Sequence, residues 1–406
     1  MHAISFEPLI WGNAVLAATP LAVLATLVTI AAFFFWLEQR TGWKLFEYLP
    51  PLIFIYFAPV ALTYFAVLPR TSPVYDAIGE LLLPVILVML LLNIDVGRAV
   101  RVMGRGVVVM LFGTLGVVIG APIGYAVVQS YLEPGSWKAF GILSGSWIGG
   151  TGNMAAMAEM LDEPAEGRAY ALAVLADTTI YIAWLPLLLG SRRLADRFGR
   201  FTGVDESRVT AMEAAAADAL AEAGPPQPAT YRDHLYVLAA ALLGSWAAAV
   251  VAPWLPALGN VVSEKTWRIL LVTTFGIAGS FTPLRRLRGG HELAMALIYV
   301  FVARMGAAAD LRGLASYALP FLAGASLWIV IHGLFCLLGA RLLKVDVHTA
   351  AIASAANIGG AASAPIVAAH HRESLVPASI LMALIGYAVG NYAALIAAQL
   401  CRWVAG

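Results

Sequence analysis

Long apolar runs alternate with short polar segments along nearly the whole chain. A helix needs about 17 to 25 apolar residues to cross roughly 30 Å of hydrocarbon, and runs of that length recur throughout. The pattern therefore predicts an all-α polytopic membrane protein of about 10–12 transmembrane helices, because the alternating period of a transmembrane barrel is absent. The expected spans are 13–37, 47–68, 74–94, 106–131, 138–161, 168–190, 234–252, 266–282, 291–308, 316–343, 348–369 and 376–400.

One long polar stretch, 191–232, interrupts this pattern and predicts a linker between two units, 1–190 and 233–406. Within the linker, the alanine-rich "VTAMEAAAADALAEA" has strong helix formers with acids on several faces, which predicts an extramembrane helix. The units look duplicated. Ile148-Gly149-Gly150 recurs as Ile358-Gly359-Gly360 at an offset of 210, and neighbouring spans pair at offsets of 208 to 217. Transporters are often built from such repeats.

Two matching spans carry polar, helix-weakening residues at their centres, "GSWIGGTGNM" and "NIGGAASAP". Irregular backbone survives at membrane depth only where it is buried in protein or lines a cavity. Breaks at the two glycine pairs would expose half-helix ends of opposite partial charge, which together suit a small anion and a cation. The alternative is close helix packing through small residues. Because the breaks occur at matched positions of two repeats, we expect two discontinuous helices forming a binding site.

Composition narrows the class further. Of 406 residues, 61% are hydrophobic and 12% charged, against about 25% charged in soluble domains. The formal net charge of +1 argues against a nucleic-acid partner. Cys336 and Cys401 lie in apolar segments, which favours small buried side chains over a disulfide or metal site. The N-terminal segment lacks a basic region, so the first apolar run reads as a retained span.

Four segments carry a family resemblance: "GSWIGGTGNMAAMAEML", "AVLADTTIYIAWLPLLL", "ANIGGAASAPIVAAHH" and "LMALIGYAVGNYAAL". From about residue 10 to its end, the chain resembles the uncharacterised membrane-protein family known as domain of unknown function 819. That family is itself similar to the bile-acid:sodium symporter and cation–proton antiporter superfamily, in which two discontinuous helices cross within a transport domain that moves against a scaffold. The resemblance implies that Ser146, Thr151, Asn153, Asn357 and Ser363 occupy the crossing-helix positions.

Asp177 is the acid placed deepest in an apolar segment, "VLADTTIYIAW". Ionisable residues inside membrane spans usually mark ion or proton pathways, so we expect Asp177 to couple transport to a cation. The alternative is that Asp177 only accepts hydrogen bonds from Thr178 or from a backbone N–H and has no coupling role. The offset of 210 places Tyr387 at the equivalent position, which predicts one carboxylate rather than a pair. A bound Na⁺ would then have Asn153, Asp177 and Asn357 as ligands.

Other polar residues carry weaker expectations. Asn391 is a further candidate near the second broken helix. Other polar residues are expected at helix ends in the membrane–water interface: Asn93, Asp95, Glu80, Glu292, Asp310 and Arg312. Arg304 and His332 could line a path, although His332 alone is more often a packed histidine, and "HHRE" at 370–373 resembles a metal site only superficially. The candidate substrate- or ion-binding residues are Ser146, Gly149, Gly150, Thr151, Asn153, Asp177, Thr178, Asn357, Gly359, Gly360, Ser363 and Asn391.

The sequence favours a secondary active transporter in a cell (inner) membrane, and the resemblance implies movement of the elevator type. We expect a small, anionic organic solute as substrate, with Na⁺ or H⁺ as coupling ion and no other cofactor. A membrane-embedded enzyme and a channel are the alternatives, but no HExxH or P-loop motif is present. We expect a homodimer, with a scaffold from spans near 13–68 and 234–282 and a transport domain from the rest.

The orientation of the repeats poses a difficulty. Six full crossings per unit would make the units parallel, whereas the resemblance implies inverted repeats. Basic residues at Arg40, Arg98 to Arg105, Arg285 to Arg288 and Lys344 favour inversion with these loops in the cytoplasm, but that choice leaves the basic linker outside. We therefore expect inverted repeats, with 234–262 crossing incompletely or as a short hairpin.

Overall fold

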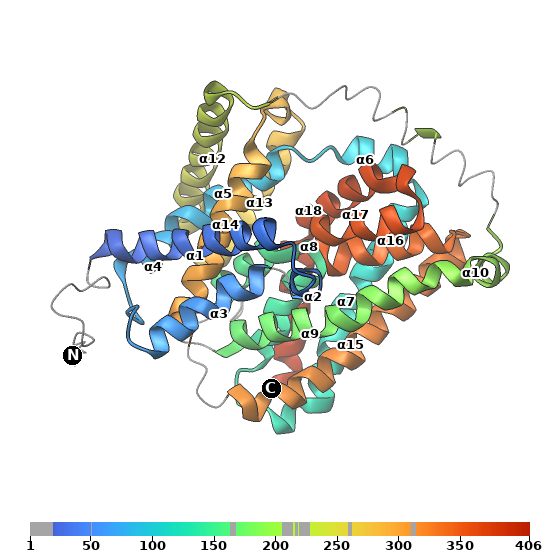
Figure 1. Ribbon diagram of the computed structural model, residues 1–406, viewed down its shortest axis with the longest axis horizontal. Helices are drawn as coiled ribbons and strands as arrows, with labels where there is room; N and C mark the ends of the chain where they lie inside the picture. Colours follow the sequence, from blue (N-terminus) through green and yellow to red (C-terminus); the bar gives the residue numbers. More distant parts are fainter. Residues whose placement is uncertain are drawn as a thin grey trace.

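The computed structural model describes residues 19–49, 51–162, 168–204, 214–215, 218, 228–258, 262–309 and 314–406, and within them the secondary structure is helical apart from one isolated β-bridge (Figure 1). Eight helical segments among these described residues are long and apolar enough to cross a membrane, so the chain is a multi-pass membrane protein. These segments are Pro20–Thr41, Pro73–Leu92, Arg105–Tyr131, Arg168–Thr202, Tyr231–Trp254, Gly290–Ala308, Leu314–Leu343 and Glu373–Ala405.

The first half, up to Thr202, places its helices in the order the apolar runs predict. Its elements are α1 (Pro20–Thr41), α2 (Leu45–Tyr48), α3 (Pro51–Tyr64), α4 (Pro73–Ala77), the π-helix Ile78–Leu82, α5 (Leu83–Leu92), α6 (Val96–Met103), α7 (Arg105–Val128), α8 (Trp137–Met160), α9 (Arg168–Gly190) and α10 (Ala195–Thr202). Local signals set several of these ends. The side chain of Thr19 accepts a hydrogen bond at the start of α1, and Gly42 ends that helix in the left-handed conformation.

The second half repeats the same order of long helices. Its elements are α12 (Tyr231–Val251), α13 (Glu264–Ser280), α14 (Gly290–Ala308), α15 (Leu314–Leu343), α16 (Val347–Ile358), α17 (Gly360–His371) and α18 (Val376–Ala405), with short 3₁₀ turns between some of them. Thr230 and Asp233 form a capping box at the start of α12, and Ser263 caps α13. These caps explain why both helices begin directly after polar segments.

Helix α8 does not run straight but reverses at Gly150. Gly150 has φ 72° and ψ −169°, a conformation that glycine adopts readily and other residues avoid. A methyl group added to Gly145 would lie 2.6 Å from the carbonyl oxygen of Asn153. In a straight helix these two residues, eight apart, would be separated by about 12 Å. The segments before and after Gly150 therefore lie side by side.

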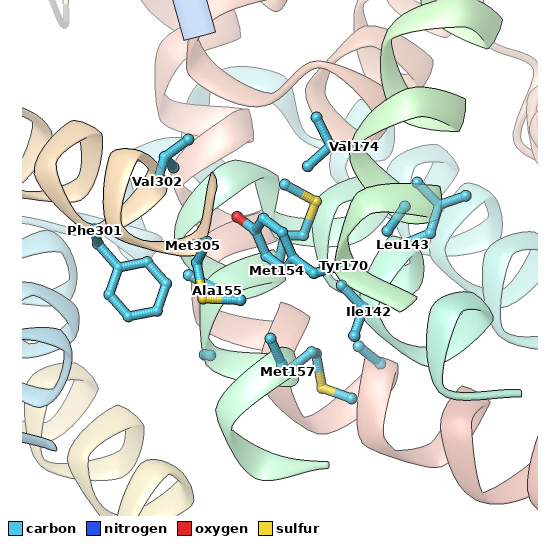
Figure 2. Close-up of a cluster of buried hydrophobic side chains, with 14 of the residues drawn as sticks. Ile142, Leu143, Met154, Ala155, Met157, Tyr170, Val174, Phe301, Val302 and Met305 are labelled. Carbon is cyan, nitrogen blue, oxygen red and sulfur yellow. The ribbon is translucent and has the colours of Figure 1, made fainter. Parts of the chain in front are cut away.

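The two ends of α8 confirm the reversal. The Lys138 ammonium donates to the carbonyl oxygen of Asp162 over 3.1 Å, so the chain leaves α8 where it entered. We call this element hairpin 1, with limbs 137–149 and 151–160. Figure 2 shows Ile142 of the first limb in the same buried cluster as Met157 of the second.

Helices α16 and α17 form a second hairpin of the same kind, hairpin 2. The Nδ1 atoms of His348, at the start of α16, and His371, at the end of α17, are 3.0 Å apart. Gly360, at the turn, has φ 58°. Each limb has 12 residues, or about 18 Å, which is roughly half of the hydrocarbon thickness. Hairpin 2 therefore enters and leaves on one side.

The long helices form two bundles, which lie on the left and right of Figure 1. Bundle A consists of α1, α3, α5, α12, α13 and α14, and bundle B consists of α7, α9, α15, α18 and both hairpins. Within bundle B, α7 packs closely against α15 and hairpin 1 against α18. Each half of the chain thus contributes three helices to bundle A, and two helices and one hairpin to bundle B.

Basic residues gather at one end of the molecule, which we call the basic end. Arg105 donates to the Leu343 carbonyl oxygen over 2.8 Å, and Arg192 to that of His370 over 2.6 Å, so these loops and the base of hairpin 2 share an end. The basic residues here are Arg40, Lys44, Arg98, Arg101, Arg105, Arg192, Arg193, Arg197, Arg200, Arg232, Arg285, Arg286, Arg288, Arg341, Lys344 and Arg372. The described segments near the opposite end carry Arg70, Lys138, Arg168, Lys265, Arg268, Arg304 and Arg402.

The structure corrects several expectations from the sequence. Segments 138–161 and 348–369 were expected to cross, but each folds back at its glycine pair. The segment near 234–262 was expected to cross incompletely, yet α12 with its 3₁₀ turn is a continuous helix of 24 residues. The 74–94 and 291–308 spans, assigned to the transport domain, pack in bundle A with the expected scaffold helices.

Helix boundaries also differ. The 47–68 span is reduced to the 14 residues of α3, and the helix expected over 168–190 continues through a 3₁₀ turn and α10 to Thr202. The first span begins later than expected, at Pro20 within the described part of the chain. The alanine-rich linker helix falls almost wholly outside the described residues, as do Asp310 and Arg312.

Candidate solute-binding site

A cavity of about 270 Å³ lies between the two bundles, where the tips of both hairpins meet. Bundle B contributes the hairpin tips and the middle of α9 and α18, and bundle A contributes α3, α5 and α14. On bundle A, the lining residues Leu52 and His291 belong to the first turns of α3 and α14, which begin at the basic end. The cavity is therefore displaced toward the basic end.

The hairpin tips meet beneath the ring of Tyr387, from α18. A methyl group added to Gly150 would lie 3.2 Å from the Tyr387 ring, and one added to Gly360 would lie 3.5 Å from it and 3.8 Å from the Gly150 Cα. Both glycines have positive φ, a backbone conformation that favours glycine, and at Gly150 the close approach of the Tyr387 ring leaves little room for a side chain as well. The paired glycines therefore bring two helix interruptions together in the middle of the protein.

Asp177 supplies the cavity with its acidic side chain. It lies in the middle of α9, beside the side chains of Ser146 and Trp147 from hairpin 1. Its Oδ1 atom is buried and accepts no hydrogen bond from the described residues. Because buried polar atoms are almost always paired, an unpaired carboxylate oxygen at a cavity wall suggests a missing ligand. The lining holds no arginine or lysine.

Three tyrosines also line the cavity: Tyr181 of α9, Tyr299 of α14 and Tyr387 of α18. None of them was predicted as a ligand from the sequence. Tyr181 lies against the tip of hairpin 2, because a methyl group on Gly359 would be 3.1 Å from its ring. His291 was also missed. Tyr387 was noted as the repeat equivalent of Asp177, but nothing in the linear pattern placed Tyr181 or Tyr299 at the site.

The structure gathers some, not all, of the predicted site residues at the cavity. Those that line it are Ser146, Gly150, Thr151, Asp177, Thr178, Gly359 and Ser363. Those that do not are Gly149, Asn153, Asn357, Gly360 and Asn391. Gly149 and Gly360 still shape the tips, because a methyl group on Gly149 would lie 2.5 Å from the Asn153 amide and Gly360 packs under Tyr387.

The three asparagines bond within the protein. The Asn153 amide donates to the Tyr387 carbonyl oxygen over 3.1 Å, which joins hairpin 1 to α18. The Asn357 amide donates to the Met110 carbonyl oxygen over 2.8 Å and accepts from Thr114, which anchors hairpin 2 to α7. The predicted grouping of Asn153, Asn357 and Asp177 around one Na⁺ is therefore not assembled at the cavity.

Asn391 connects the bundles instead. Its amide donates to the Thr273 hydroxyl of α13 over 2.8 Å, while its Oδ1 atom is buried without a partner in the described structure. One residue further on, the Tyr392 and Thr274 hydroxyls are 2.6 Å apart. These bonds place polar contacts between α18 and α13 beside the cavity.

Polar contacts also join the two bundles at the end opposite the basic end, which we call the closed end. The Lys265 ammonium of α13 lies 2.7 Å from Asp162, directly after hairpin 1, and this hydrogen bond holds the pKa of the Asp162 carboxyl below its ordinary value. The Thr266 hydroxyl donates to the Met160 carbonyl oxygen over 3.1 Å. Hairpin 1 is thus tied to bundle A at its base.

A buried arginine completes this closed end. Arg304 of α14 is only 7% exposed and donates to the Tyr75 carbonyl oxygen over 2.9 Å. Its guanidinium and the Glu159 carboxylate of hairpin 1 both approach Gly79, because a methyl group there would lie 3.0 Å and 3.5 Å from them. Arg304 therefore acts at the boundary between the bundles and does not line the cavity.

Two histidine groups belong to the framework of bundle B. His332 of α15 is fully buried, and its ring nitrogens lie 2.9 Å from the Gly113 carbonyl oxygen and 2.9 Å from the Ser354 hydroxyl. It is a packed histidine. The "HHRE" segment lies at the base of hairpin 2, and no group of three metal-binding side chains occurs in the described part of the chain.

Comparison with known proteins identifies the family of this chain. The family model described as "Protein of unknown function (DUF819)" matches residues 25–404, nearly the whole chain. The chain belongs to the DUF819 family. It is also 27% identical over 372 residues to the "Uncharacterized membrane protein YjcL" of Bacillus subtilis (strain 168), a match that covers 88% of this chain and 90% of that protein. The expected family is therefore confirmed, and this DUF819 protein shares its membrane location with that relative.

Proposed function

We propose that this protein is a secondary active transporter of a small organic solute. The observation that carries the proposal is the cavity at the boundary of two bundles, lined by two interrupted hairpin tips and by half-buried Asp177, whose Oδ1 atom is buried without a partner among the described residues. Irregular backbone at membrane depth is tolerated where it lines such a cavity. Binding at the meeting point of two repeats is the usual arrangement in secondary transporters. A cavity between two separable bundles favours transport over catalysis.

The hairpins also support inverted repeats. Each hairpin enters and leaves on the same side, hairpin 1 at the opposite end and hairpin 2 at the basic end. Each half of the chain would therefore cross the membrane five times instead of six. An odd number of crossings inverts the second half relative to the first. The contacts agree, because a methyl group on Gly113 would meet Cys336 while one on Gly124 would meet Gly324, so α7 and α15 run antiparallel. Five crossings per half would therefore be consistent with inverted repeats.

The same topology gives the protein an orientation. Five crossings per half bring the linker to the basic end, together with the loops after α1, α5, α13 and α15. Cytoplasmic loops carry an excess of lysine and arginine, so the basic end would face the cytoplasm. This orientation suits the inner membrane of a cell. The cavity, displaced toward the basic end, would then correspond to a state that faces inward.

Alternating access would follow from movement of bundle B against bundle A. In the inward-facing state, contacts such as Lys265–Asp162 hold the opposite end closed. Moving bundle B, which carries both hairpins and Asp177, would break these contacts and expose the site to the other side. This is an elevator-type motion, with bundle A as the scaffold.

The coupling ion would bind at Asp177. In a largely apolar cavity without arginine or lysine, one carboxylate is balanced by one Na⁺ or by one proton. The other titratable side chains in the lining are His291 and the three tyrosines. Asp177 would therefore make binding depend on Na⁺ or on pH.

Thermal unfolding of the purified protein against Na⁺ and pH tests this proposal without a known solute. A ligand that binds only the native state stabilises it by about 2.7 kcal/mol at a hundredfold excess over its dissociation constant. We expect Na⁺, or a shift of pH, to raise the Tm of the wild type, and Asp177→Asn to remove that response, because the amide is nearly isosteric but uncharged.

Asp95→Asn serves as the matched control. Asp95 caps α6 and pairs with Arg285 at the basic end, away from the cavity. This variant should keep the response to Na⁺ and pH. A response that survives in Asp177→Asn, or that is lost only in Asp95→Asn, would contradict the assignment of the coupling site.

A further inference from the structure

The charged groups around the cavity specify the kind of solute it accepts. The half-helix ends suggested an anion from sequence alone, but the lining contains one carboxylate, Asp177, and no arginine or lysine. An anionic solute would meet a like charge, and among the described lining residues only His291 could carry a positive charge to offset it. A cationic solute would instead leave the occupied site close to neutral.

The helix N-terminus at the tip of hairpin 2 is also not free to bind an anion. The second limb of this hairpin begins at Gly360, and its first backbone N–H groups would be the donors. The Tyr387 ring covers the glycines of both tips, and its hydroxyl oxygen would lie 3.7 Å from a methyl group on Gly360. A neutral side chain of the protein therefore occupies the place an anion would take.

Aromatic rings complete a site suited to a cation. Tyr181, Tyr299 and Tyr387 reach the cavity from α9, α14 and α18, so rings of both bundles border the space beside Asp177. The negative face of an aromatic ring attracts ammonium groups, and quaternary ammonium ions are often bound in cages of such rings. The apolar walls, including Leu90, Met295 and Ile298, suit the alkyl groups of such an ion.

We propose that the transported solute is a small organic cation, an amine or quaternary ammonium compound, held by Asp177 and the cavity tyrosines. This inference rests on the proposed function. Because one carboxylate can balance one cation at a time, the organic cation and the coupling ion would compete for Asp177. Binding of the two would then be mutually exclusive, which favours exchange over cotransport.

Binding of choline and of its neutral isostere, 3,3-dimethyl-1-butanol, to the purified protein tests the charge requirement. The two probes have nearly the same shape and differ in one charge. We expect choline and tetramethylammonium to raise the Tm while the neutral isostere and succinate do not. In calorimetry, Na⁺ or protons should weaken choline binding in proportion to their occupancy of Asp177.

Variants separate the parts of the site. Asp177→Asn should abolish choline binding. Tyr299→Leu should weaken it by about 2- to 30-fold, the range expected for loss of one cation–π contact, whereas Tyr299→Phe should retain it. A loss in Tyr299→Phe equal to that in Tyr299→Leu would contradict a role for the ring.

The outcomes distinguish this inference from the proposed function. If Na⁺ or pH acts through Asp177 but succinate binds and ammonium compounds do not, the transporter proposal stands and the cationic solute is wrong. If choline and its neutral isostere bind equally well, the charge requirement is also wrong. If Asp177→Asn responds to Na⁺, to pH and to all four probes in the same way as the wild type, both proposals fail together.

Discussion

Two glycines with positive φ, Gly150 and Gly360, turn two membrane helices back on themselves and pack under one tyrosine ring. An L-residue pays about 1–2 kcal/mol to adopt such a left-handed conformation. At Gly150, a methyl group would also press on the Tyr387 ring at 3.2 Å. The tip of hairpin 1 therefore depends on glycine for both reasons.

We expect Gly150→Ala to lower the Tm and to abolish stabilisation by Na⁺ or pH, because the strained tip and displaced ring deform the cavity. Gly190→Ala is the matched control: Gly190 ends α9 in a helical conformation, with open space around its Cα. That change should be neutral or slightly stabilising. Thermal unfolding of both variants with and without Na⁺ checks this, and a Gly150→Ala protein that behaves like the wild type would contradict it.

At this scale the sequence singled out the glycine pairs and Asp177, which lie at or beside the cavity, and also the asparagines, which do not line it. A polar residue in an apolar run signals a special role, and glycine and aspartate have few alternatives there. Asn153 and Asn357 had an alternative, since an amide can satisfy backbone groups of a neighbouring helix. Whether an amide faces a cavity or a helix depends on packing between distant segments, which no local pattern contains.

At the scale of elements, the main surprise is that both glycine-rich segments are hairpins. Their length, about 24 residues, equals that of a crossing helix, so length and hydropathy could not separate the two possibilities. The deciding information is the reversal at Gly150 and near Gly360. Most of the other long helices, in contrast, begin and end within a few residues of the prediction, because each is a long apolar run; the exceptions are the 47–68 span, reduced to α3, and the 168–190 span, continued to Thr202.

Cysteine labelling from one side of the membrane tests the hairpins. In a background in which the buried Cys336 and Cys401 are replaced by alanine, single cysteines at Pro134 and Asp162 flank hairpin 1, and single cysteines at Lys344 and Glu373 flank hairpin 2. We expect an impermeant maleimide to label the members of each pair from the same side, and the two pairs from opposite sides. Labelling of one pair from both sides would show that its segment crosses.

At the scale of the whole molecule, the two bundles meet through polar contacts at the opposite end and through the cavity nearer the basic end. The Lys265–Asp162 pair is partly exposed, and such pairs contribute about 0.2–1 kcal/mol. That is too little to hold the fold together but enough to bias an equilibrium between two arrangements of the bundles.

We expect Lys265→Glu to shift that equilibrium away from the inward-facing state by like-charge repulsion with Asp162. A single cysteine at Met295, in the cavity lining, should then react about two- to fivefold more slowly with a maleimide supplied from the basic end. Lys344→Glu makes the same charge change at the basic end and should leave the rate unchanged. Equal rates in Lys265→Glu and its parent would mean that the pair does not bias the bundles.

The position of Tyr387 has a mechanical consequence. Its ring touches the tips of both hairpins, its carbonyl oxygen accepts from Asn153, and it belongs to the helix that contacts α13. Neither tip can shift without displacing the ring, and the ring cannot move without disturbing the other tip. The tips of hairpin 1 and hairpin 2, which come from separate halves of the chain, are therefore mechanically coupled. We expect the parts of the site that they form to bind and release ligand together.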